Sequence, residues 1–315
     1  MYNVSGQGTV HNLPNYSGHL FTADAVNTPI LTMIGGLTGG LVSENFEFAT
    51  DSQYQFPQAA QPAITETGSL TAPTAVGYVR SQGTNVAQIF QEKVSVSYEK
   101  LANGGRMSGL NTAGQQNNVP SEKDFQIATA LKKIARDIEY TIINGAYQKA
   151  TDATTANKTR GLLALCADSN LGGTTIAVNA GLKKANLQAL FKAMYDAGAV
   201  FENCVLWTNS KQKQIISEIY GYAPTDRNIG GVNIKQIETD FGNIGVALNR
   251  FMPQGSLVCA EMNVLAPVFQ NVPEKGCFFY EPLAKTGASE DGQIFGKFGL
   301  DHGPAFMHGS LTNLS

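Results

Sequence analysis

A period of two in the hydrophobic and polar positions is the most regular pattern near the start of the chain. In residues 85–100, NVAQIFQEKVSVSYEK, the apolar residues Val94, Val96 and Tyr98 alternate with polar ones. This alternation is typical of a strand that buries one face. If the whole stretch is extended, it spans roughly 50 Å at about 3.3 Å per residue, whereas ordinary strands have about 5–6 residues.

A second alternating stretch, residues 45–59, precedes the first and includes Phe46 and Tyr54. The residues between the two stretches, 59–83, show no helical period and contain several Gly, Pro, Ser and Thr residues that break regular structure. We therefore predict one long two-stranded hairpin within residues 45–100. Because an isolated hairpin is only marginally stable in water, it needs a surface to lie against.

A helical period follows and predicts a long helix over residues 121–150. Ser121 is suited to cap its N-terminus, although Gly145 weakens the last turns. Apolar residues at steps of three and four form the expected buried face, namely Ile127, Leu131, Ile134, Ala135, Ile138 and Ile142. Charged residues are expected to lie largely elsewhere, namely Lys132, Lys133, Arg136, Asp137 and Glu139.

Helices and strands are mixed in the second half. A helix is expected over about 183–197, ending at Gly198, and a buried strand over 201–207. Thr208 or Asn209 then caps a third helix. The apolar residues expected on these two helices are Leu187, Leu190, Phe191, Met194, Tyr195, Ile215, Ile216, Ile219 and Tyr220, and the third helix ends at Gly221.

Strands dominate residues 231–270, where two extended segments flank a turn at 241–243, and the tail from 277 to 308 contains further short strands. The order of elements indicates an α+β fold. The 315 residues are 43% hydrophobic and only 15% charged, against about 25% charged in a typical domain. Such a surface is compatible with extensive coverage by other subunits.

Charge and cysteine content narrow the function further. The net charge is −3, no Lys or Arg precedes Arg80, and no basic stripe indicates nucleic-acid binding. Neither a secretory signal nor an apolar run of about 20 residues is present, so no membrane segment is expected. Four cysteines fit no zinc or redox spacing and are expected to be buried thiols in a reducing cytosol: Cys166, Cys204, Cys259 and Cys277.

Motifs that carry catalytic chemistry are weak. GGLTGG, residues 35–40, lacks the Lys-Ser or Lys-Thr of a phosphate loop, so a flexible hinge is expected. Two SxxK pairs, Ser97 with Lys100 and Ser210 with Lys213, lack the companion motifs of the penicillin-binding class. In the first pair, at a strand end, the two side chains are not expected to converge.

The histidines and carboxylates give no stronger signal. Asp301 and His302 would suit a triad, but no GxSxG elbow accompanies them. Arg106 is expected in a surface ion pair rather than at an anion. No metal-binding spacing links the histidines, His11, His19, His302 and His308. Acid–base chemistry is not expected from the scattered Glu44, Glu47 and Asp51. We therefore predict no catalytic, cofactor-binding or metal-binding residue, no cofactor and no enzyme activity.

Three stretches in this order resemble the major capsid proteins of tailed bacteriophages, which have the Hong Kong 97-type shell fold. They are NVAQIFQEKVSVSYE at 85–99, DFQIATALKKIARDIEYTIINGAY at 124–147 with TRGLLAL at 159–165, and EPLAKTGASEDGQIFGKFGL at 281–300. The resemblance covers nearly the whole chain. It implies a structural subunit that assembles itself into an icosahedral shell around double-stranded DNA.

The resemblance also implies a division of the chain into segments. The expected segments are an N-terminal arm at 1–44, an extended loop formed by the long β-hairpin at 45–100, a peripheral domain at 101–198 with the spine helix at 121–150, an axial domain at 199–265, and C-terminal strands at 266–315 that complete the peripheral domain. In this family the hairpin and the arm lie across a neighbouring subunit. The long strand therefore need not find its partner surface within its own chain.

The implied partners are other copies of the chain, in hexamers and pentamers, and a portal protein. Some relatives cross-link through a Lys on the extended loop, but no Lys occurs before Lys93 here, so a shell without such cross-links is expected. No room is expected for a scaffold domain ahead of the hairpin, so a scaffolding protein, like a decoration protein, would be separate. Assembly in the bacterial host cytoplasm and a place in the virion capsid are implied. A slightly acidic subunit would enclose DNA without sequence-specific binding and let the duplex slide.

Other functions are kept open. A cellular nanocompartment shell of the same fold would enclose an enzyme instead of DNA. A hydrolase would use Asp301 with His302 or one SxxK pair, and would be a monomer or small oligomer. A tail-tube or fibre protein is usually dominated by strands, and the helix at 121–150 speaks against it.

Overall fold

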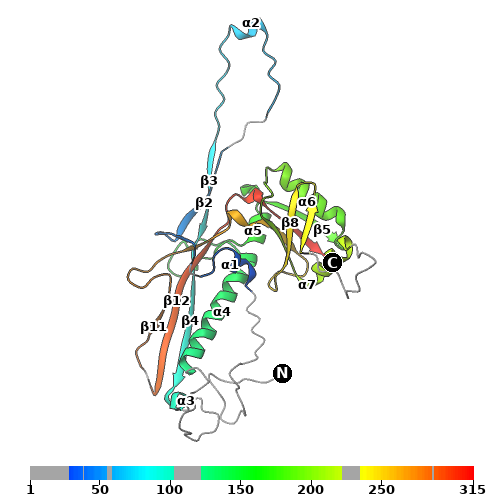
Figure 1. Cartoon of the computed structure of the whole chain (residues 1–315). Coiled ribbons are helices and arrows are strands. Elements are labelled where there is room, and N and C mark those ends of the chain that lie inside the picture. Colours follow the sequence, from blue (N-terminus) through cyan, green and yellow to red (C-terminus); the bar gives the residue numbers. More distant parts are fainter. Residues whose placement is uncertain (1–27, 38, 55–58, 103–121, 222–234, 286) are drawn as a thin grey trace.

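A computed structural model describes residues 28–37, 39–54, 59–102, 122–221, 235–285 and 287–315, without the side chains of 52–54. It contains a five-stranded sheet, a six-stranded sheet and a separate two-stranded hairpin (Figure 1). Helices and strands occur in both halves of the chain, so the α+β class is confirmed.

The five-stranded sheet has β12 (Ser289–Asp301) at its centre. On one side β12 pairs with β4 (Gln88–Ser97), antiparallel from Ser289 opposite Ser97 to Phe298 opposite Gln88. On the other side it pairs with β10 (Ala266–Phe269) and β11 (Phe278–Pro282), and β1 (Leu41–Val42) adds to β10 in parallel.

The long helix α4 (Glu122–Asn144) packs along β4 and β12, as Figure 1 shows. Its isoleucines Ile134, Ile138 and Ile142 share one buried cluster with Phe90, Val94, Val96, Ile294 and Phe298 of the sheet. The expected face is confirmed at these isoleucines, whereas Leu131 is exposed. Glu139, expected away from the face, is fully buried.

The predicted helix 121–150 is wrong at its C-terminal end, because α4 stops at Asn144. The amide of Gly145 still donates to Thr141 O at 2.8 Å, but the chain then turns, and Gly145 O accepts the amide of Gly161. A Cβ atom at residue 145 would lie 2.6 Å from Thr159 O. Only glycine fits this close approach of two backbones, and the helix therefore ends there.

The alternation in residues 85–100 is confirmed for β4, in which Phe90, Val94 and Val96 are buried. The strand ends at Ser97, however, and Tyr98 is 41% exposed at the start of α3 (Tyr98–Ala102). The prediction that this stretch forms the second arm of the hairpin is wrong, since β4 pairs with β12 of its own chain.

The six-stranded sheet has the order β5-β13-β9-β6-β8-β7. The pairs β5–β13 and β6–β8 are parallel and the other three are antiparallel. The strands are β5 (Thr174–Ala180), β13 (His308–Leu314), β9 (Leu257–Glu261), β6 (Cys204–Thr208), β8 (Gly242–Leu248) and β7 (Gln236–Thr239). The last strand, β13, pairs with β5 and β9, so residues 266–315 contribute strands to both sheets.

Both faces of the six-stranded sheet are buried at its central strands β6 and β9. Val205 and Trp207 of β6 face the cluster that contains α4 and α5 (Leu162–Ala167). Leu206 faces a second cluster with α6 (Lys184–Asp196) and α7 (Ser210–Tyr220). This two-sided burial explains why FENCVLW shows no alternation.

Both predicted helices of this half are confirmed. Asn209 caps α7, since its Oδ1 accepts the amide of Gln212 at 2.9 Å. Gly198, with φ +102°, follows the end of α6. Tyr195, which the helical pattern places on the buried face, is 57% exposed.

Three short 3-10 helices lie between strands or helices of the two sheets: η1 (Ser169–Leu171) precedes β5, η2 (Met262–Val264) precedes β10, and η3 (Ala305–Met307) precedes β13. A single short helix, α1 (Pro29–Met33), packs on α4 ahead of β1.

Candidate assembly surfaces

The two-stranded hairpin consists of β2 (Glu47–Tyr54) and β3 (Arg80–Val86). The strands pair antiparallel from Glu47 opposite Val86 to Tyr54 opposite Arg80. Figure 1 shows the hairpin projecting from the rest of the molecule, with the short helix α2 (Glu66–Ser69) near its tip. A long hairpin is therefore present ahead of β4. It extends from Glu47 to Val86, whereas the predicted hairpin covers residues 45–100.

Every residue from 59 to 82 is exposed. The apolar side chains in this stretch, with 68–84% of their area accessible, are Ile64, Leu70, Val76 and Val79. Its charged residues are Glu66 and Arg80 alone. Apolar surface costs about 25 cal/mol per Å² when it is left in water, and a contiguous exposed patch marks an interaction surface.

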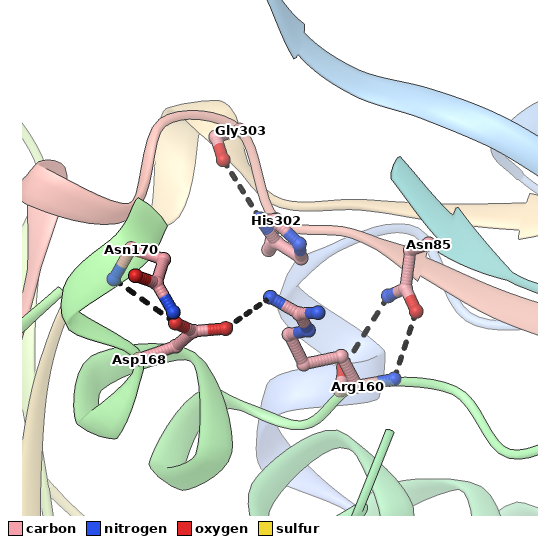
Figure 2. A network of polar contacts seen from close by, with 6 residues as sticks. All are labelled: Asn85, Arg160, Asp168, Asn170, His302 and Gly303. Carbon is pink, nitrogen blue, oxygen red and sulfur yellow. Dashed lines mark hydrogen bonds and ion pairs between the residues drawn. The ribbon is translucent and has the colours of Figure 1, made fainter. Parts of the chain in front are cut away.

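The root of this hairpin, in contrast, is fixed by Asn85, which is fully buried near the end of β3. Its Nδ2 donates to Leu300 O of β12 at 2.8 Å and to Arg160 O at 3.4 Å. Its Oδ1 accepts the amides of Arg160 at 2.8 Å and Val86 at 2.9 Å. Figure 2 shows this side chain bonded to the backbone of Arg160, which lies in the connection between α4 and α5, here called the 160 loop.

Arg160 extends the same network (Figure 2). Its Nη1 donates to Asp168 Oδ2 at 3.1 Å, and the guanidinium lies 4.4 Å from the ring centre of Tyr147. Asp168 Oδ1 also accepts the amide of Asn170. Polar groups from β3, from Arg160 and Asp168 on either side of α5, and from the end of β12 therefore meet at the hairpin root. Both polar atoms of the Asn85 side chain are hydrogen-bonded there, which attaches β3 rigidly, whereas Arg160 Nε is buried with no hydrogen-bond partner among the described residues.

Two further contacts hold the first strand of the hairpin. Glu47 Oε2 accepts Lys149 Nζ at 2.6 Å, and this bond is the main cause that lowers the pKa of Glu47. The amide of Ala87 donates to Phe46 O at 2.7 Å. Above the root, the register of the pair shifts between Ala49 and Asp51, so the pairing of β2 with β3 is irregular there.

Asp301 and His302, which would suit a triad, each make a local contact with Gly303. Asp301 Oδ1 accepts the amide of Gly303 at 3.1 Å, while His302 Nδ1 lies 2.7 Å from Gly303 O. The carbonyl can only accept, so His302 carries its proton on Nδ1. Burial lowers the pKa of His302 and of His308 to about 4, so both are neutral at pH 7.

The SxxK pairs have local roles. Ser97 Oγ accepts the amide of Lys100 at 3.4 Å at the start of α3. In the second pair, Ser210 is exposed on the first turn of α7, whereas Lys213 is buried. Desolvation lowers the pKa of Lys213. The two side chains of this pair thus stand in different surroundings.

GGLTGG does not form a phosphate loop, because it follows the short helix α1 and leads into β1. Gly40 has φ +145°, and a Cβ there would collide with Pro267 O. Its glycine therefore allows β1 to approach β10. Residue 38 of the motif lies outside the described residues.

The cysteines, possible metal ligands and possible membrane helices remain to be placed. Cys166, Cys204 and Cys259 are buried free thiols, and Cys277 is partly exposed. In the described ranges, no group of three or more His, Cys, Asp or Glu residues could hold a metal ion. Likewise, no helix in the part of the chain that the structure describes is long and apolar enough to cross a membrane. His11, His19, Arg106 and Ser121 lie outside the described residues.

Asn85 and Arg160 were not singled out in the sequence. An asparagine inside an alternating strand is a weak signal, since it breaks the apolar pattern without naming a partner. Its partners come from residues 160 and 300, which no local pattern connects.

A projecting hairpin with a rigid root, a long helix on a sheet and a second sheet unit together define a capsid subunit of the Hong Kong 97-type fold. The family model described as SU10 major capsid protein matches residues 3–315. The chain belongs to this family. It is a major capsid protein of a tailed phage, and it forms the icosahedral shell by self-association into hexamers and pentamers.

Solved structures share this fold at low sequence identity. A chain of the cyanophage A-1(L) capsid asymmetric unit has TM-score 0.68 and 14% identity over 96% of this chain and 97% of that chain. A chain of the native GTA particle capsid has TM-score 0.58 and 12% identity over 100% and 96%. The SrpI encapsulin complex of Synechococcus elongatus PCC 7942 has TM-score 0.54 and 11% identity over 97% and 93%. No curated protein sequence matches the chain.

Proposed function

We propose that, in the shell, the β2–β3 hairpin of each subunit lies across a neighbouring subunit and holds the two together. The observation that carries this proposal is the exposure of every residue from 59 to 82, including four large apolar side chains. No core residue of the described chain lies in this stretch. Its apolar surface is removed from water only when another copy covers it.

The rigid root supports this role. A neighbour can be held in a defined place only if the hairpin leaves its own subunit in a defined direction. Asn85 and Arg160 supply that direction, because they tie β3 to β12 and to the 160 loop. Many copies of one weak contact then act together in a closed shell.

The two sheet units suggest how the implied segments divide. We assign the five-stranded sheet with α4 to the peripheral domain and residues 28–44 to the N-terminal arm. The six-stranded sheet, with α6 and α7, is then the axial domain, whose copies meet at the centre of each hexamer or pentamer. This domain includes β5 and β13, so it extends beyond residues 199–265.

The shell so formed would enclose double-stranded DNA without reading its sequence. A net charge of −3 offers few phosphate contacts, each of which would hold the duplex through counterion release. A portal protein would occupy one vertex, and scaffolding or decoration proteins, where used, would be separate chains. Assembly would take place in the host cytoplasm, by a structural subunit without enzyme activity. No Lys precedes Lys93, so the hairpin has no amine for a cross-link.

Removal of the hairpin tests the proposal. Deletion of residues 60–82 should leave a folded subunit, because none of these residues is buried. Particles should become unstable or fail to close, as measured by electron microscopy and light scattering. A second variant keeps the full length of the hairpin but replaces Ile64, Leu70, Val76 and Val79 by Ser. It should also make the shells less stable. Shells of normal stability from the deletion variant would show that the hairpin does not join subunits.

A nanocompartment shell remains the second candidate, because the SrpI encapsulin shares the fold. The two differ in contents. A virion shell contains double-stranded DNA, whereas a nanocompartment is small and contains protein cargo. Nucleic-acid content and particle diameter from the natural source decide between them.

A further inference from the structure

Glu139 is a fully buried carboxylate on α4. Its Oε1 accepts the amide of Ile30 at 3.0 Å, and its Oε2 accepts the amide of Leu31 at 2.8 Å. Oε1 also accepts the side-chain amide of Asn249. Thr28, at the N-cap of α1, makes no side-chain capping bond, so Glu139 satisfies amides of α1 from another element.

All three of these partners are donors, so the site requires an acceptor at both oxygens. Burial raises the pKa of Glu139, and the bonds from Leu31, Ile30 and Asn249 oppose that effect. A buried carboxylate is costly unless it is fully hydrogen-bonded. Charge-assisted bonds to backbone amides are among the stronger hydrogen bonds in proteins.

Asn249 belongs to the other sheet unit. It directly follows β8, and its own amide donates to Thr208 O of β6 at 2.8 Å. Its Oδ1 accepts the amide of Phe251 at 2.9 Å. The six-stranded sheet therefore fixes where the Asn249 side chain lies. Glu139, on α4, thus connects α4 both to α1 and to this sheet.

We propose that Glu139 is a positioning residue that couples the place of α1 to the six-stranded sheet. A displacement of that sheet relative to α4 removes the Asn249 bond, weakens the hold of Glu139 on the amides of Ile30 and Leu31, and so loosens the attachment of α1 to α4. Any effect of this coupling on a shell rests on the proposed function, which assigns residues 28–44, including α1, to the N-terminal arm. The coupling itself is a property of the single chain.

The experiment measures amide hydrogen exchange in peptides that contain Ile30 and Leu31, using the unassembled full-length chain. Asn249→Ala removes the donor to Glu139 but touches no residue of α1. We expect exchange at these amides to become at least about tenfold faster, since a hydrogen bond to a charged group is worth that much in an equilibrium constant. Glu139→Gln should do the same, because its amide nitrogen cannot accept a bond.

Asn144→Ala is the matched control. Asn144 Nδ2 donates to Phe251 O at 2.9 Å. This change therefore removes a bond between α4 and the residues that follow β8, where Asn249 also lies, without removing any bond of Glu139. It should leave the Ile30 and Leu31 amides unchanged. Equal acceleration by Asn144→Ala and Asn249→Ala, or none by Asn249→Ala, would overturn the coupling. Because the readout needs no shell, it is independent of whether the hairpin joins subunits.

Discussion

Acid should destabilise the subunit through two buried histidines, His302 and His308. Both are almost wholly inaccessible, and burial lowers the pKa of each from 6.5 to about 4. The unfolded chain therefore binds protons more readily than the folded one between pH 6.5 and 4. Stability is fully present above pH 6.5, and it falls as the pH drops towards 4.

The size of the effect follows from these two values. At pH 5 an unfolded histidine is almost fully protonated and the folded one is almost neutral, which costs about 2 kcal/mol for each, at 1.36 kcal/mol per pH unit. The pair therefore removes about 4 kcal/mol between pH 7.5 and 5. Glu139 acts in the opposite direction, because its pKa is raised in the folded chain.

Urea unfolding of the unassembled subunit at pH 7.5, 6 and 5 measures this loss. The double variant His302→Gln, His308→Gln is expected to be less stable at pH 7.5, since His302 bonds to Gly303 O and His308 to His302 O. Its stability should nevertheless change by about 4 kcal/mol less between pH 7.5 and 5. An unchanged pH slope in this variant would refute the reasoning.

Two further changes test the core and the hairpin root. Ile134→Asp places an unpaired charge in the fully packed face of α4 and should abolish soluble folding, as seen by expression and circular dichroism; a soluble variant with the native melting temperature would contradict this packing. Asn85→Ala leaves the amides of Arg160 and Val86 and the carbonyl of Leu300 without their partner, so we expect a loss of about 2–4 kcal/mol in urea unfolding, and no loss would show that water replaces these bonds.

Local patterns in the sequence predict the elements of this fold well. Alternation locates β4, steps of three and four locate α4 and α6, and Asn209 caps α7 as expected. These features depend on neighbours in sequence, so a single chain reveals them.

Pairing between distant segments could not be predicted in the same way. The alternating stretch 85–100 includes the end of β3 and all of β4, yet β3 pairs with β2 and β4 pairs with β12. The division depends on Asn85, whose partners stand 75 and 215 positions away. The final strand β13 likewise follows β12 closely but joins the other sheet.

Glu139 shows the same limit at one residue. Its neighbours on α4 place it beside the apolar face, and a carboxylate there would ordinarily point to solvent. It is buried because α1 and Asn249 bring three donors to it, and those donors come from positions about 110 residues away. No charge pattern along the helix carries that information.

Electron microscopy with light scattering on particles from the natural source tests the capsid role most directly. Closed icosahedral shells that contain double-stranded DNA and are built from hexamers and pentamers of this chain are the predicted result. Small shells filled with protein cargo would contradict it. A chain found only as a monomer, with no closed shells, would also contradict it.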